Sequence, residues 1–261
     1  RDRSVSRGLG DVYKRQGEGP TDYGKVDYGN PGHWIDGPVQ VYLRRIAEEQ
    51  NIELDFEMIE RAEVQKIKLQ RRHLNGLDGK AIPARRFYIK CKEKQLNYGV
   101  YYCDADRNAG EQNSNVHQLE NRYKEVYGEV KEGMYNCDNY IPMIPCRMIE
   151  NWILADGENI RDFFQVNKIE YNPHNVELLW GNDNNPESNY PKNVFERIKS
   201  SSKNRDIKNL SNSELFYEIA ERQNLAIVKK NSSISFARFH DDYISLLRSE
   251  MLWAVRFQDL T

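Results

Sequence analysis

Apolar residues recur along the chain in short blocks, and the spacing within each block indicates which element it forms. Recurrence at helical spacing predicts helices over about 38–50, 82–96, 115–127, 148–155, 213–222 and 239–257. Alternating or short continuous apolar runs predict strands over 52–58, 99–103 and 140–145. Pro142 and Pro145 place the last strand at a sheet edge or a strand end. The alternation of predicted strands and helices along the chain predicts an α/β fold with a mostly parallel sheet flanked by helices, followed by a mainly helical C-terminal region.

The composition narrows the class of protein without identifying a partner. The 38 basic residues nearly balance the 40 acidic residues, so the net charge of -2 favours no particular ligand. No apolar run approaches the length that crosses a bilayer, which predicts no membrane association. The four cysteines show no CxxC spacing, so reduced thiols in a cytoplasmic protein are a better interpretation than a zinc site.

Residues 1–16, RDRSVSRGLGDVYKRQ, differ in character from the rest of the chain. They have no starting Met and no apolar stretch of the kind that a signal peptide carries. They resemble the in-frame translation of a transposon-based sequencing adaptor, which implies a native start near Gly17. We therefore expect this segment to lie outside the native fold and the native first strand, before Gly17, to be missing. Lys14, Arg15 and Gln16 are poor residues for a central strand.

Two aspartates follow the predicted strand at 99–103. Asp104 and Asp106 stand at its carboxyl end, and in an open α/β sheet the carboxyl ends of the strands border the crevice where ligands bind. Carboxylates so close together repel each other, and a hard divalent cation relieves that repulsion. The alternative is a helix N-cap followed by a surface acid, which the pair alone does not exclude.

Two further acids have positions that can complete such a site. Glu18 lies in a turn-rich segment after the expected first strand, where an isolated acid is usually solvated. Glu150 lies in an otherwise apolar predicted helix, in which an unpaired buried acid is costly, although the helix could simply be amphipathic. An acid after the first strand, an Asp-x-Asp pair after a middle strand and an acid after the next strand together carry more weight than any one of them.

A strongly basic stretch over residues 64–94 offers a surface for a polyanion. Lys and Arg side chains near an acidic site can hold phosphates with salt-dependent affinity. The alternative is that these charges form ordinary solvated helix faces. The candidate phosphate-binding residues, including one beside the Asp-x-Asp pair, are Arg71, Arg72, Arg85, Arg86 and Arg107.

Four segments carry a resemblance to a known family. The sequence reads GEGPTD at 17–22, YCDADR at 102–107, IPCRMIENWILAD at 144–156 and SISFARF at 233–239. In this order and spacing they resemble the DUF4276 family of Toprim-like domains in bacterial proteins, over about Gly17 to Leu247. The third segment is similar to the family's E-x-W-L-L-A-D signature, with Ile153 in place of the first Leu. The fourth is similar to its S-P-S-F segment, with Ile234 in place of the proline.

The resemblance implies a Toprim-like, Rossmann-like catalytic domain over 17–157 and a helical region over 158–261. It implies a nuclease that cleaves DNA or RNA with Mg²⁺, for which Mn²⁺ can substitute. Relatives in the family also imply a role in anti-phage defence, an ATPase partner and a homodimer. The residues implied as catalytic and metal-binding are Glu18, Asp104 and Asp106, with Glu150 at a second metal position and Asp22 and Asp156 as further candidates.

Two other functions stay open. A Toprim-like module without catalysis would bind nucleic acid or a partner protein. A phosphatase of the haloacid dehalogenase type would use an Asp-x-Asp motif for an aspartyl nucleophile and an acid, with Thr or Val two residues later and near the N-terminus. Here residue 108 is Asn and the motif lies in mid-chain, so this alternative is the weaker one.

Overall fold

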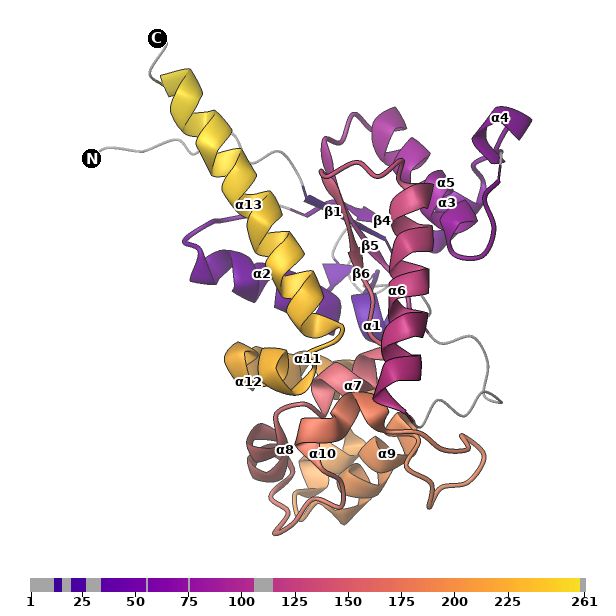
Figure 1. The fold of residues 1–261 in the computed structure, drawn as a ribbon. Coiled ribbons are helices and arrows are strands. Elements are labelled where there is room, and N and C mark those ends of the chain that lie inside the picture. Colours follow the sequence, from indigo (N-terminus) through magenta and orange to yellow (C-terminus); the bar gives the residue numbers. More distant parts are fainter. Residues whose placement is uncertain are drawn as a thin grey trace.

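A four-stranded sheet lies at the centre of the computed structural model, which describes residues 12–15, 20–26, 34–54, 56–74, 76–105 and 115–258 (Figure 1). In space its strands follow the order β4-β1-β5-β6, and each neighbouring pair is parallel. The predicted α/β class is therefore confirmed. The strands are β1 (Val12–Arg15), β4 (Met58–Ile59), β5 (Tyr98–Tyr102) and β6 (Tyr140–Met143), and a separate antiparallel pair is formed by β2 (Lys25–Val26) and β3 (Trp34–Ile35).

Helices make the connections between the strands. Those before β6 are α1 (Pro20–Tyr23), α2 (Pro38–Glu49), α3 (Arg61–Gln65), α4 (Arg71–Leu74), α5 (Ala81–Glu93) and α6 (Val116–Gly133). After β6, every described element is helical: α7 (Ile149–Ile153), α8 (Gly157–Phe164), the 3-10 helix η1 (Pro173–Leu178), α9 (Pro191–Ser201), α10 (Arg205–Asn209), α11 (Asn212–Arg222), α12 (Leu225–Asn231) and α13 (Phe236–Gln258).

The helices cover both faces of the sheet. Successive side chains of a strand point to opposite faces, so Val100 and Tyr102 of β5 enter one hydrophobic cluster while Tyr101 and Cys103 enter the other. Helices α5 and α6 cover the face of Tyr101, and α2, α7 and α13 cover the face of Tyr102. Figure 1 shows α6 and α13 on opposite sides of the strands.

The predicted helices form with boundaries that differ by a few residues, but one predicted strand is mostly absent. Of the predicted strand at 52–58, only Met58 is in β4, because β1 pairs with this segment only at Met58 and Ile59. The expectation for the last strand is confirmed, since β6 lies at the edge of the sheet with Pro142 in its middle.

The central position of the sheet is occupied by β1, which belongs to the segment that resembles an adaptor. Val12–Arg15 pairs with Tyr98–Tyr101 of β5 on one side and with β4 on the other. This corrects the expectation that residues 1–16 take no part in the fold. Parallel pairing uses main-chain groups, so a strand with Lys14 and Arg15 can fill the position that the native first strand was expected to hold.

One hydrophobic cluster continues across the predicted domain boundary at residue 157. It contains Val39 of α2, Val100 of β5 and Leu247 of α13, so the helices after residue 157 complete the core on one face of the sheet. The first of these helices lie beyond the carboxyl ends of the strands (Figure 1). Among the described helices, none combines the length and the apolar character that a bilayer crossing requires.

Candidate active site at the carboxyl ends of the strands

Asp104 lies just beyond the carboxyl end of β5, and the main chain around it is held by the neighbouring strand. The Cys103 amide donates to the Met143 carbonyl at 3.2 Å, and the Ala105 amide donates to the Pro145 carbonyl at 3.1 Å. Strand pairing thus extends past the end of β5 and fixes the segment that carries Asp104. The side chain of Asp104 is buried, with 6% of its surface exposed.

The Tyr102 hydroxyl joins Asp104 to a second acid. Its oxygen lies 3.2 Å from Oδ1 of Asp104 and 3.2 Å from Oδ2 of Asp22. Asp22 is on α1, the helix that follows β1, so this phenol connects the carboxyl ends of two adjacent strands. The sequence named Asp22 only as a further candidate, and the structure places it beside Asp104.

Glu150 lies near the same hydroxyl. It is in the first turn of α7, the helix that follows β6, and it is buried with 5% exposure. Burial, then the negative charges of Asp104, Asp22 and Glu150, raise the pKa of Tyr102 well above its ordinary value. Two acids, which follow the neighbouring strands β1 and β5, therefore contact one phenol, and an acid that follows β6 acts on it through its charge. We call Asp22, Asp104 and Glu150 the acid cluster.

Part of the predicted site lies outside the described residues. This applies to Glu18, Asp106 and Arg107. The donors of the acid cluster are carboxylate oxygens, which suit a hard cation such as Mg²⁺. Within the described part of the chain, however, no three His, Cys, Asp or Glu side chains are arranged to hold a metal ion. The chemistry of the donors fits the ion, and a complete set of ligands would need Glu18 or Asp106 as well.

Asp156 has a different role from the one that the resemblance suggested. Its Oδ1 accepts from the Asn159 amide at 3.2 Å, which caps the N-terminus of α8. Its Oδ2 accepts from the Asn224 amide at 2.9 Å, just before α12. Both oxygens thus bind backbone amides at helix starts. Asp156 therefore has a structural role at two helix starts, and its role as a metal ligand stays a prediction.

Arg85 is likewise structural. Its guanidinium donates to the carbonyls of Gly133, His73 and Glu132, and its carbon lies 3.4 Å from the centroid of the Tyr135 ring. These bonds fix the C-terminus of α6. They give Arg85 a structural role, and binding of a phosphate by this residue stays a prediction.

The other predicted phosphate-binding residues of the basic stretch also lie away from the acid cluster. Arg86 follows Arg85 on α5, and its Nε is buried without a partner among the described residues. Arg71 and Arg72 are in α4, and their side chains are outside the described part of the structure. Figure 1 shows α4 at the upper right, apart from α1 and α7, which lie near the middle of the view. Helix α4, which carries Arg71 and Arg72, therefore lies apart from the acid cluster.

Two arginines that the sequence analysis did not predict as site residues lie closer to the acid cluster. Arg122 of α6 donates from Nε to the Ala105 carbonyl at 3.1 Å and pairs with Glu125 at 2.7 Å. Arg147 follows β6, is 2% exposed, and places its guanidinium carbon 4.2 Å from the centroid of the Trp180 ring. Arg122 could have been predicted as a neighbour of Asp104 because it lies in the first half of the helix that follows the Asp-x-Asp pair.

Two of the segments that carried the family resemblance meet in the core. The Trp152 indole donates to the Ser235 hydroxyl at 2.8 Å. Glu177 accepts from the amides of Ile234 and Ser235, each at 3.0 Å, just before α13 begins. Trp152 and Ser235 therefore have a structural role at this junction.

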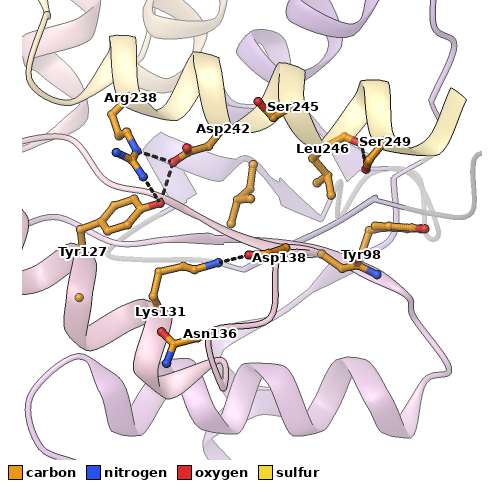
Figure 2. Close-up of a pocket in the computed structure, with 13 residues that line it drawn as sticks. Tyr98, Tyr127, Lys131, Asn136, Asp138, Arg238, Asp242, Ser245, Leu246 and Ser249 are labelled. Carbon is orange, nitrogen blue, oxygen red and sulfur yellow. Dashed lines mark hydrogen bonds and ion pairs between the residues drawn. The ribbon is translucent and has the colours of Figure 1, made fainter. Parts of the chain in front are cut away.

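A cavity of about 1040 Å³ lies elsewhere, between α6, α13 and the edge strand β6 (Figure 2). Arg238 on one wall bonds Asp242 at 2.9 Å, and Lys131 on the other lies 3.8 Å from Asp138. Both cations thus contact carboxylates. The cavity also includes Tyr98, at the amino end of β5, whereas the acid cluster is at the carboxyl end.

No family model, curated protein or solved structure matches this chain. The family resemblance therefore stays a prediction, and the acid cluster is the structural basis on which function can be inferred.

Proposed function

We propose that this chain is a Mg²⁺-dependent nuclease of the Toprim type, which hydrolyses phosphodiester bonds in DNA or RNA. The observation that carries the proposal is the contact of Asp22 and Asp104 with one buried hydroxyl, that of Tyr102, on which the charge of Glu150 also acts. Three acids brought together from separate elements repel one another, and a bound cation would offset that repulsion.

The order of the strands supports the same location. When the four strands of the parallel sheet are numbered as they occur in the sequence, their order in space is second, first, third, fourth. Open sheets with this order bind ligands beyond the carboxyl ends of the first and third strands, where the connections diverge to opposite faces. Here those strands are β1 and β5, and Asp22 and Asp104 follow them.

The chain's own residues would hold the ion and keep its surroundings rigid. Asp22, Asp104 and Glu150 would bind Mg²⁺ together with Glu18 and Asp106. When bound, Mg²⁺ polarises the phosphate and lowers the pKa of a coordinated water. Arg122 donates to the Ala105 carbonyl, which would fix the main chain directly after Asp104.

The substrate and the partners are less closely defined. A nucleic acid is proposed because a phosphodiester is the group that such an acidic metal site would serve. The ATPase partner, the homodimer and the role in anti-phage defence rest on the family resemblance alone.

The direct test compares two buried aspartates. Purified chain is incubated with plasmid, single-stranded DNA and tRNA in the presence of Mg²⁺ or Mn²⁺, as wild type, Asp104→Asn and Asp156→Asn. We expect Asp104→Asn to lower the cleavage rate by about 100-fold or more, the scale of losing one strong electrostatic contact to the transition state. Asp156→Asn serves as the control, with cleavage close to wild type below its unfolding temperature.

Two results would reject the proposal. Wild type that cleaves none of these substrates with either ion would leave only the non-catalytic binding module. Cleavage that survives Asp104→Asn would show that the acid cluster is not the active site.

A further inference from the structure

Tyr102 occupies a position that none of the sequence motifs explains. It is the last residue of β5 and stands two residues before Asp104, so both side chains point to the same face of the sheet. Its side chain is fully buried in the cluster that contains α2, α7 and α13. A phenylalanine would fill this space equally well, so the hydroxyl needs a separate explanation.

The hydroxyl contacts two carboxylates with a single proton. The distances to Asp22 Oδ2 and Asp104 Oδ1 are the same, 3.2 Å, yet a phenol donates only one hydrogen bond at a time. The phenol therefore gives its proton to one carboxylate or shares it between the two, and in either case its oxygen stays between both acids. The two acids arrive from different elements, since α1 follows β1 and Asp104 follows β5.

We propose that Tyr102 is a positioning residue that holds Asp22 and Asp104 at the spacing from which both act on one divalent cation. This inference rests on the proposed metal-dependent function and adds a residue to its site. Hydrogen bonds from neutral donors orient carboxylates before the ion arrives, so that the ion does not have to gather them. Without the hydroxyl, the two carboxylates would repel and turn apart.

The experiment removes only the oxygen atom. Mn²⁺ serves as the probe, with its binding followed by electron paramagnetic resonance and by calorimetry, on wild type and on Tyr102→Phe without nucleic acid. Tyr243→Phe is the matched control, because Tyr243 is a fully buried phenol of the same hydrophobic cluster whose hydroxyl has no partner among the described residues.

We expect Tyr102→Phe to bind Mn²⁺ about tenfold more weakly, the order expected for a hydrogen bond to a charged group. Tyr243→Phe should bind as wild type does. In cleavage assays, the Mn²⁺ concentration that gives half-maximal rate should rise while KM for the nucleic acid stays unchanged. Thermal unfolding of both variants separates this effect from a loss of folding.

A double-mutant cycle tests whether Tyr102 acts through Asp22. In the Asp22→Asn background, Tyr102→Phe should weaken Mn²⁺ binding much less than it does in wild type, because one of the two groups to be positioned is gone. Equal effects in both backgrounds would overturn the proposed role.

The outcomes separate this inference from the function on which it rests. Wild type that binds no Mn²⁺ would reject the metal site and the role of Tyr102 with it. Wild type that binds Mn²⁺ while Tyr102→Phe binds equally or more tightly would reject only the role of Tyr102 and leave the metal site standing.

Discussion

Two groups of buried acids in this protein differ in what surrounds them. Asp156 and Glu177 accept hydrogen bonds from backbone amides at the starts of helices. Asp104 and Glu150, which are equally buried, lie with Asp22 around one phenol. Amides at a helix start stabilise a negative charge, whereas neighbouring acids oppose it. Burial alone therefore does not identify a functional carboxylate; the surrounding groups do.

The largest effect expected from this comparison is on stability at Asp156. Asp156→Ala leaves the Asn159 and Asn224 amides without their acceptor, so the free energy of unfolding should fall by about 2–3 kcal/mol. Urea denaturation followed by circular dichroism measures this change. Asp162→Ala, an exposed aspartate on the same helix, is the control and should change stability by less than about 0.5 kcal/mol. An equally small effect at Asp156 would remove the basis for calling it structural.

At Glu150 a substitution should change the free energy of unfolding in the opposite direction. Glu150→Gln removes one of three like charges near Tyr102, so the free energy of unfolding should rise by about 1 kcal/mol while Mn²⁺ binding weakens. The exposed Glu158 provides the control, because Glu158→Gln should change neither quantity. If Glu150→Gln destabilised the protein as Asp156→Ala does, the two groups of acids would not differ in kind.

The smallest effect concerns the pH dependence of Glu177. Burial raises the pKa of Glu177, and hydrogen bonds from the Ser235 hydroxyl and the Ile234 and Ser235 amides oppose part of that rise. A raised pKa means that the folded state binds the proton more tightly than the unfolded state. The stability that Glu177 contributes is therefore highest below its ordinary pKa. It is lost as the pH rises through the pKa that Glu177 has in the folded state.

Urea denaturation of wild type and Glu177→Gln across this pH range checks the sign. The difference in free energy of unfolding, wild type minus variant, should decrease as the pH rises from about 4.5 and then level off. A difference that increases with pH would mean that the amides outweigh burial.

The sequence predicted the elements whose pattern is local. Helix α6 and the strand β5 follow directly from spacing, and Pro142 correctly indicated an edge strand. The segment before Met58 alternates like a strand, but the pairing that the structure describes between it and β1 begins only at Met58. Strand formation depends on a neighbour, which periodicity cannot reveal.

The candidate site divides in the same way. The position of Asp104 after a strand was predictable, and so was that of Glu150 after the next strand. The roles of Asp156 and Arg85 depend on partners distant in sequence, such as Asn224 and Gly133, and a motif gives no information about them. Tyr102 could have been found from its spacing alone, since residues two apart on a strand share a face.

The core on the face of Tyr102 has a consequence for synthesis on the ribosome. It draws side chains from Val39 to Leu247, and Trp152 reaches its hydrogen-bond partner only when Ser235 is present. A nascent chain that has just passed Asp104 still lacks roughly 140 residues of this core, which take on the order of ten seconds to translate. Throughout that interval α2 is the only one of the three helices on this face that has been made. The emerging chain is then a natural client for a chaperone until the last helix has been made.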